Sequence, residues 1–314
     1  MSGRGPSRSP RRDPHRHAEP GPRPHLPRLR TGPGRDAPRR SPAVRAGGKG
    51  LNVARVVAQT GGAAVVLTTA GGPSGLRLAD DLEASRLPNE LVAVASPTRS
   101  SIAIVDESAG ETTVINETGG SLTEAEWTAL RDAAARLAVP ATCVVGSGSL
   151  PPDAPDDLYA GLVAIAAERG IPSVIDAVGT ALVLAAEAGA SVVKPNRREL
   201  AETTGNDDPV AGARALIDAG AGLVLVSLGA EGMLAVTDSA EPLHLRTAQP
   251  LVGNPTGAGD AAVAAVASLL AAGVSDPALL LRRAVAWSAA AVLAPLAGEL
   301  HPSYPELEAR LVTG

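Results

Sequence analysis

The chain reads Asn254-Pro255-Thr256-Gly257-Ala258-Gly259-Asp260 near its C-terminus, followed by a run of alanine and valine at 261–267. Glycines permit a tight turn and let backbone N–H groups approach a ligand closely. The run of small residues predicts a helix, and the N-terminus of a helix favours an anion such as phosphate. Asp260, at the start of that helix, can orient or deprotonate a hydroxyl group. The stretch thus combines three parts of a phosphoryl-transfer site, although by itself it also fits a dinucleotide-binding loop.

Strand-like and helix-like patterns alternate along most of the chain. A fully apolar segment such as 223–226 is typical of a parallel strand that is covered on both faces. Helices are predicted at 51–59, 75–85, 123–137, 155–169, 180–187, 260–272 and 277–293, and strands at 63–69, 142–146, 173–176, 191–194, 223–227 and 233–237. This order predicts an α/β fold with a mostly parallel sheet and helices on both faces. Ligands of such sheets bind beyond the carboxyl ends of the strands.

One region departs from this alternation. Segments 91–95, 101–105 and 112–116 have strand patterns, and the last two are joined by a polar turn. Because no helix separates the three segments, we expect them to form an antiparallel patch.

Residues 1–45 differ in composition from the rest of the chain. They hold ten prolines and twelve arginines but only three acidic residues, and they show no periodicity. Prolines at this density exclude a regular helix or a central strand, so an irregular or disordered segment is expected before a domain at 46–314. We hypothesise that the segment derives from a frameshift or a misassigned start in GC-rich DNA. The alternative is a genuine basic tail that binds nucleic acid or a partner.

Composition also narrows the class of protein. The net charge is −5 although the first 45 residues are basic, so the body of the chain is acidic and no nucleic-acid partner is expected for it. The single Cys143 excludes an internal disulfide and fits a reducing compartment. No apolar run reaches the roughly 18 residues of a membrane span, and no secretory signal is apparent. We therefore expect a soluble cytoplasmic protein without a membrane partner, and, since Phe is absent, a core of small aliphatic side chains.

Two glycine- or serine-rich loops carry candidate ligand-binding residues. The first, 46–52, opens a helix with three glycines and offers Lys49 and Asn52 to an anion or a sugar. The second, 146–152, follows a strand and offers hydroxyl groups, Ser149 among them, that suit a polyol. A flexible loop before a helix and an ordinary strand–helix connection are the respective alternatives.

Two further loops suit a nucleotide and its metal. In 194–199, Asn196 and Glu199 lie three residues apart and can organise Mg²⁺ directly or through water, or can form an ordinary helix N-cap. Lys194 precedes them, and it and Lys49 are the two lysines of the whole chain. The tight turn at 227–232 suits a nucleotide or a simple hairpin.

In this order the loops resemble those of the phosphofructokinase B family of sugar kinases, in its 1-phosphofructokinase and tagatose-6-phosphate kinase branch. The matching segments are 47–54, 147–152, 194–196 with Glu199, 227–229 and 254–260. The resemblance implies a ribokinase-like three-layer sandwich with a mostly parallel sheet. It also implies a small antiparallel β lid at about 91–118, incomplete here because residues 1–45 lack the family's first strand.

The resemblance further implies a role for each matching residue. Asp260 would be the catalytic base, and the N–H groups of Gly257, Ala258 and Gly259 would form an anion hole for the moving phosphoryl group. Asn196 and Glu199 would organise Mg²⁺ and the phosphates, with Glu199 acting indirectly on the metal; Ser227, Gly229 and Gly232 would line the ATP site; and Lys49, Asn52, Arg99 and Ser149 would hold the sugar phosphate.

The implied reaction is ATP-dependent phosphorylation of a ketohexose phosphate, with ATP and Mg²⁺ as cofactors. Branch resemblance favours fructose 1-phosphate, which gives fructose 1,6-bisphosphate, and leaves tagatose 6-phosphate and fructose 6-phosphate as alternatives. The family's Asn-Pro-Ala-x-Asp-like segment, whose Asp binds sugar hydroxyls, has no counterpart in residues 1–45. A second hypothesis is therefore a nucleotide-binding remnant with impaired catalysis. The homodimer that relatives form through the lid is in question for the same reason.

Overall fold

The computed structural model describes residues 45–106 and 111–314, so the segment predicted to be irregular lies almost wholly outside the described residues. The helices are α1 (Lys49–Gln59), α2 (Gly72–Ala84), α3 (Glu124–Leu137), α4 (Leu158–Glu168), α5 (Thr180–Glu187), α6 (Arg197–Thr204), α7 (Pro209–Ala219), α8 (Ala258–Ala271), α9 (Pro277–Val292) and α10 (Tyr304–Ala309). The strands are β1 (Val66–Ala70), β2 (Asn89–Ala93), β3 (Ser101–Asp106), β4 (Glu111–Asn116), β5 (Val144–Ser147), β6 (Ser173–Asp176), β7 (Val192–Val193), β8 (Val224–Ser227), β9 (Met233–Val236), β10 (Leu243–Thr247) and β11 (Leu311–Thr313).

Seven strands form the central sheet, in the order β11-β10-β9-β8-β7-β6-β5. Strands β5 to β8 are parallel, because each returns to the same end of the sheet through a helix. The hairpin from β8 to β9 begins an antiparallel edge that continues through β10 and β11. The predicted α/β fold with a mostly parallel sheet is confirmed.

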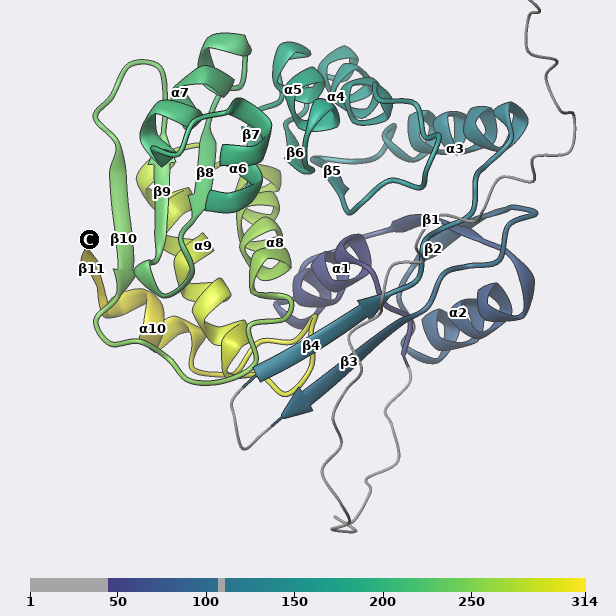
Figure 1. Ribbon diagram of the computed structural model, residues 1–314, viewed down its shortest axis with the longest axis horizontal. Coiled ribbons are helices and arrows are strands. Elements are labelled where there is room, and N and C mark those ends of the chain that lie inside the picture. The colour runs from purple at the N-terminus through teal and green to yellow at the C-terminus, as the bar shows by residue number, and fades with distance from the viewer. Residues whose placement is uncertain (1–44, 107–110) are drawn as a thin grey trace, which may run out of the picture. The chain divides into compact units, whose positions relative to one another are not determined.

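Helices cover both faces of this sheet (Figure 1). In β8, Val224 and Val226 pack in the cluster that contains residues of α4, α5 and α7, whereas Leu225 packs with residues of α8 and α9. Successive strand residues point to opposite faces, so burial on both sides requires the continuous apolar run that the sequence shows.

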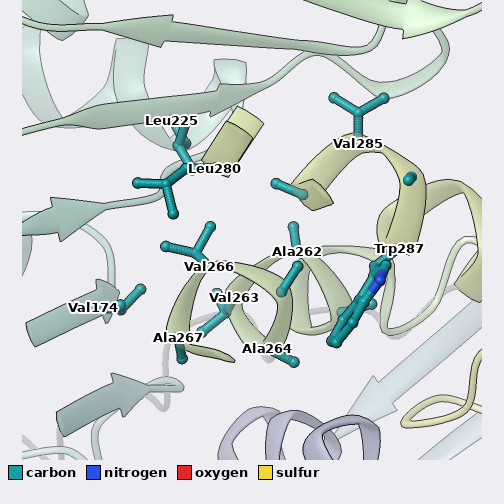
Figure 2. Packing of buried hydrophobic residues seen from close by; sticks show 14 of the residues in the cluster. Val174, Leu225, Ala262, Val263, Ala264, Val266, Ala267, Leu280, Val285 and Trp287 are labelled. Atoms are coloured by element: carbon teal, nitrogen blue, oxygen red, sulfur yellow. The ribbon is translucent and has the colours of Figure 1, made fainter. Parts of the chain in front are cut away.

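Small side chains allow helix α8 to pack closely against the sheet and against the neighbouring helices. Ala261, Ala262, Ala264 and Ala265 are completely buried, and α8 contacts α1, α9, β5 and β6. Figure 2 shows Ala262, Val263 and Val266 of this helix among core residues from the sheet and from α9. The expected core of small aliphatic residues is present.

Strands β1 and β2 form a separate parallel pair, with Val66 opposite Asn89. The expectation that all three segments near residues 91–116 form an antiparallel patch was therefore wrong for the first of them. Helix α2 provides the crossover that a parallel pair requires. Among the described residues, no strand joins this pair to β5, and α1 packs against both β1 and β5.

Strands β3 and β4 form the antiparallel hairpin predicted for the lid, with Ser101 opposite Asn116. Residues 107–110 of its turn lie outside the described residues. A homodimer through this hairpin stays a prediction. Across the described ranges, no helix combines the length and apolar character needed to cross a membrane.

Candidate active site

The glycine turn before α8 adopts a backbone conformation that suits glycine. Gly257 has a φ of 86° and is the N-cap of α8. An added Cβ there would lie 2.9 Å from the Cβ of Ala297, so the position is both left-handed and closely packed. Because α8 begins at Ala258, the first N–H groups of the helix have no intrahelical acceptor and suit an anion, although the N–H of Ala258 donates to the carbonyl of Pro255 at 3.2 Å.

Asp260 lies in the first turn of α8 and is buried, with 6% of its surface exposed. Burial raises the pKa of its carboxyl group, while a hydrogen bond from Asn52 and the charges of Lys49 and Lys194 act in the opposite direction. The Nδ2 of Asn52, on α1, donates to Oδ2 of Asp260 at 2.8 Å. Asn52, predicted to hold the sugar phosphate, therefore contacts the candidate base directly.

A cluster of opposite charges lies at the carboxyl end of β6. The carboxylate of Asp176, whose side chain is 1% exposed, is 3.3 Å from Nζ of Lys49 and 3.6 Å from Nζ of Lys194. Ser147, at the end of β5, donates its hydroxyl to Oδ2 of Asp176 at 3.3 Å. Burial lowers the pKa of Lys49, but the carboxylates of Asp176, Glu199 and Asp260 outweigh burial and raise it.

The sequence motifs assign neither Asp176 nor Lys194 to the site. Lys194 is one of the two lysines and lies in the matching segment 194–196 but received no role, and Asp176 stands out only as the end of a predicted strand. A usable signal was present for Asp176, since a carboxylate that ends a buried parallel strand lies where ligands of such sheets bind.

Arg99 and Ser149, both predicted to hold the sugar phosphate, are brought together. Nη2 of Arg99 donates to Oγ of Ser149 at 2.7 Å. Ser149 lines a cavity of about 320 Å³ between the loops that follow β5 and β6, together with Tyr159 and Thr180. This pair extends the candidate site from β6 toward the region of the β3–β4 hairpin.

Asn196 and Glu199 form a capping box at the start of α6. Oδ1 of Asn196 accepts from the N–H of Glu199 at 2.8 Å, and Oε2 of Glu199 accepts from the N–H of Asn196 at 2.9 Å. Asn196 also forms a parallel bridge with Ser227, which ends β8 and leads into the turn at 229–232. Gly229 and Gly232 have φ values of 64° and 92°, so both need the freedom of glycine.

The side-chain oxygens of Asn196 and Glu199 fit a magnesium ion that would be held mainly through water and phosphate. Within residues 45–106 and 111–314, no three His, Cys, Asp or Glu side chains converge to form a metal site. Mg²⁺ usually keeps several waters and binds through one or two carboxylates plus substrate phosphates. The carboxylate of Glu199, which caps the helix that begins after Asn196, would be one ligand of this kind.

Residues 30–303 match the model of the pfkB family of carbohydrate kinases. The chain belongs to this family. The 1-phosphofructokinase of Xanthomonas campestris is 38% identical over 236 residues, which cover 72% of this chain and 73% of the relative. The ATP-dependent 6-phosphofructokinase isozyme 2 of Escherichia coli is 33% identical over 242 residues, or 75% of this chain and 78% of the relative.

Solved structures agree with this assignment. The phosphofructokinase-2 of Escherichia coli in complex with fructose 6-phosphate is 31% identical, with a TM-score of 0.75 over 86% of this chain and 89% of that one. Arabidopsis thaliana ribokinase, at 20% identity and a TM-score of 0.61 over 84% of this chain and 88% of that one, shares the fold. The predicted pfkB family membership and ribokinase-like fold are confirmed.

The capping box of this pfkB family member supports a stability prediction. We expect Asn196→Ala to lower the free energy of unfolding by about 1 kcal/mol, because the N–H of Glu199 loses its acceptor. Asn196→Ser should retain most of the stability, since a serine hydroxyl is also a good N-cap acceptor. Urea unfolding followed by circular dichroism measures both. Equal losses in the two variants would show that the side-chain cap is not what stabilises this helix.

Proposed function

We propose that this pfkB family kinase transfers the γ-phosphoryl group of ATP to the free primary hydroxyl of a fructose phosphate, with fructose 1-phosphate as the preferred acceptor. One observation carries the proposal: a buried carboxylate, Asp260, lies one turn from a left-handed glycine at the N-terminus of α8, next to two lysines. The resemblance to the 1-phosphofructokinase branch supports fructose 1-phosphate, although the motifs themselves are shared with kinases of the other fructose and tagatose phosphates. The name of the Xanthomonas campestris relative also supports fructose 1-phosphate. The name of the Escherichia coli relative supports fructose 6-phosphate as the main alternative, and tagatose 6-phosphate is a further one.

In this reaction Asp260 accepts the proton of the acceptor hydroxyl. The hydroxyl oxygen bonds to the γ-phosphorus while the bond from phosphorus to the bridging oxygen breaks, and ADP leaves. The N–H groups of Gly257, Ala258 and Gly259 stabilise the charge on the moving phosphoryl group. Since the transition state of phosphoryl transfer is loose, positioning and charge stabilisation contribute more than the strength of the base.

The remaining residues bind and orient the two substrates. Glu199 and Asn196 would organise Mg²⁺ through water, and the ion neutralises phosphate charge when it is bound. Ser227, Gly229 and Gly232 would line the nucleotide. Lys49, Arg99 and Ser149 would hold the sugar phosphate, and Asn52, which donates to Asp260, would also contact the sugar.

Release of ADP, coupled to pyruvate kinase and lactate dehydrogenase, tests the proposal over a panel of sugars and sugar phosphates. We expect the highest kcat/KM with fructose 1-phosphate. A higher kcat/KM with fructose 6-phosphate would reassign the acceptor. ATP binding by calorimetry without turnover of any acceptor would favour a catalytically impaired remnant, and a protein that binds no ATP would contradict both proposals.

The acid limb of the pH profile should reflect Asp260. Because burial raises its pKa above the ordinary 3.8, the inactive protonated form accumulates at a higher pH than for an exposed carboxyl group. We expect kcat to fall with decreasing pH through that raised pKa. Asn52→Ala removes a hydrogen bond that lowers the pKa, so it should move the limb to still higher pH.

Gln59→Ala is the matched control for this pH shift. Gln59 is also an amide on α1, but its hydrogen bonds go to the backbone of Leu300. Its replacement should leave the acid limb in place. If the fall in kcat occurs at the pH expected for an exposed carboxyl group and does not move in Asn52→Ala, the assignment of Asp260 as the base would be contradicted.

A further inference from the structure

We propose that Asp176 is a positioning residue that holds the ammonium groups of both lysines, Lys49 and Lys194, in the phosphoryl-transfer site. The inference rests on the proposed kinase function and deepens it. The sequence motifs suggested a role for Lys49 and none for Lys194, whereas the structure joins the two lysines through one carboxylate.

The backbone at Asp176 is fixed within the sheet, because β6 pairs with β5 on one side and with β7 on the other. Asp176 ends β6, lies opposite Ser147 of β5, and accepts a hydrogen bond at its carbonyl from the N–H of Gly148 at 3.2 Å. All four residues of β6 are buried. A side chain on such a strand provides a more rigid anchor than one on a loop.

The two lysines reach this anchor from different elements. Lys49 is the first residue of α1, and Lys194 follows β7. A Cβ added to Gly259 would lie 3.3 Å from Nζ of Lys194, so this ammonium group lies against the proposed anion hole. Lysine side chains have many rotamers, and an ion pair at the ammonium group removes most of that rotamer freedom before a ligand binds. Asp176 thereby orients one positive charge toward each substrate.

The position of the carboxylate indicates an action through the lysines. Oδ1 of Asp176 is its carboxylate oxygen nearest to Nζ of Lys194. Oδ2 of Asp176 accepts a hydrogen bond from the hydroxyl of Ser147 and lies 3.3 Å from Nζ of Lys49. The side chain of Asp176 is 1% exposed. Little surface is left for a substrate or a metal ion to touch. A buried carboxylate requires partners of this kind, as does Lys194, whose side chain is 5% exposed.

Kinetics of Asp176→Asn test the inference. The substitution keeps the shape of the side chain and removes its charge. We expect the KM for the sugar phosphate to rise roughly ten- to a hundredfold, the usual effect of losing a charge-assisted contact, together with a fall in kcat. In a Lys49→Met background, Asp176→Asn should raise this KM much less, because the anchored group is already absent. Equal effects in both backgrounds would contradict the proposal.

A second readout does not depend on turnover. Because the chain has two lysines, amine labelling followed by mass spectrometry reports on Lys49 in a single peptide. Lys49 should be labelled several-fold faster in Asp176→Asn than in the wild type. Ser173→Ala is the matched control, since Ser173 is a buried hydrogen-bonded residue at the other end of β6, and it should change neither labelling nor KM.

Ser147→Ala keeps the test decisive if Asp176→Asn does not fold. It removes one hydrogen bond from Asp176 while retaining every charge, and should cause a smaller rise in both the KM and the labelling rate. No change in either quantity would overturn the proposal. A wild type that turns over no acceptor, yet shows faster labelling of Lys49 in Asp176→Asn, would reject the kinase proposal while the ion-pair anchor stands.

Discussion

Asp260→Asn should lower kcat by about three orders of magnitude, within the range expected when a positioned acid–base group is lost. The asparagine side chain has the same shape but cannot accept the proton of the acceptor hydroxyl. Steady-state ADP release at saturating ATP and sugar phosphate measures the effect. Asp276→Asn is the matched control, because Asp276 also begins a helix, α9, yet is exposed, and it should leave kcat unchanged.

The same substitution should not destabilise the fold at neutral pH. Burial raises the pKa of Asp260 in the folded state above its ordinary value, so the folded protein binds the proton more tightly than the unfolded chain. Stability at this site therefore increases as the pH falls through the interval between the two pKa values, and the charged form opposes folding above it. The neutral amide introduced by Asp260→Asn removes that opposition. A loss of kcat without a loss of thermal stability supports a catalytic role for Asp260, whereas an unchanged kcat would contradict it.

Gly257→Ala should lower kcat by roughly 10²- to 10³-fold, the effect typical of disturbing one donor of an anion hole. The new Cβ would meet Ala297 at 2.9 Å, so the turn must move, and the N–H groups at the start of α8 move with it. The φ of 86° adds strain of about 1–2 kcal/mol for a residue with a side chain.

Gly273→Ala distinguishes the loss of kcat that a disturbed anion hole causes from the loss of stability that backbone strain causes. Gly273 follows the other end of α8 with a φ of 79°, and an added Cβ would meet no atom within 4 Å. It should show a comparable strain in urea unfolding but no loss of kcat. If the two variants lose kcat equally, the effect of Gly257→Ala comes from global destabilisation and not from the anion hole.

Local sequence patterns predicted the elements that depend on near neighbours. The glycine turn, α8 and the alternation of strands and helices follow from residues a few positions apart. Strand β2 was assigned to the antiparallel patch with β3 and β4, whereas it pairs with β1. The pairing of a strand depends on which strand the fold brings beside it, and local sequence does not report that. Helix α7, strands β10 and β11, and helix α10 were not predicted: α7 carries Gly212 in its interior, and the other three are short edge or terminal elements.

The charges of the candidate site could be predicted only in part, for the same physical reason. Lys49, Asn52 and Asp260 were identified from glycine-rich motifs, but the bond between Asn52 and Asp260 spans 208 positions and that between Lys49 and Asp176 spans 127. No periodicity reports such a contact. For Asn196 and Glu199 the spacing fitted either an ordinary helix N-cap or a metal-organising pair, and the structure contains a capping box, in which Asn196 is the N-cap.

Phosphorus-31 NMR of the product tests the proposed chemistry most directly. Wild type and Asp260→Asn are each incubated with ATP, Mg²⁺ and fructose 1-phosphate. The wild type should convert the acceptor to fructose 1,6-bisphosphate with stoichiometric ADP, and Asp260→Asn should leave both substrates nearly unchanged. Equal conversion by the two proteins, or ATP binding by the wild type without transfer to any fructose phosphate, would contradict the assignment of Asp260 and its glycine turn as the phosphoryl-transfer site.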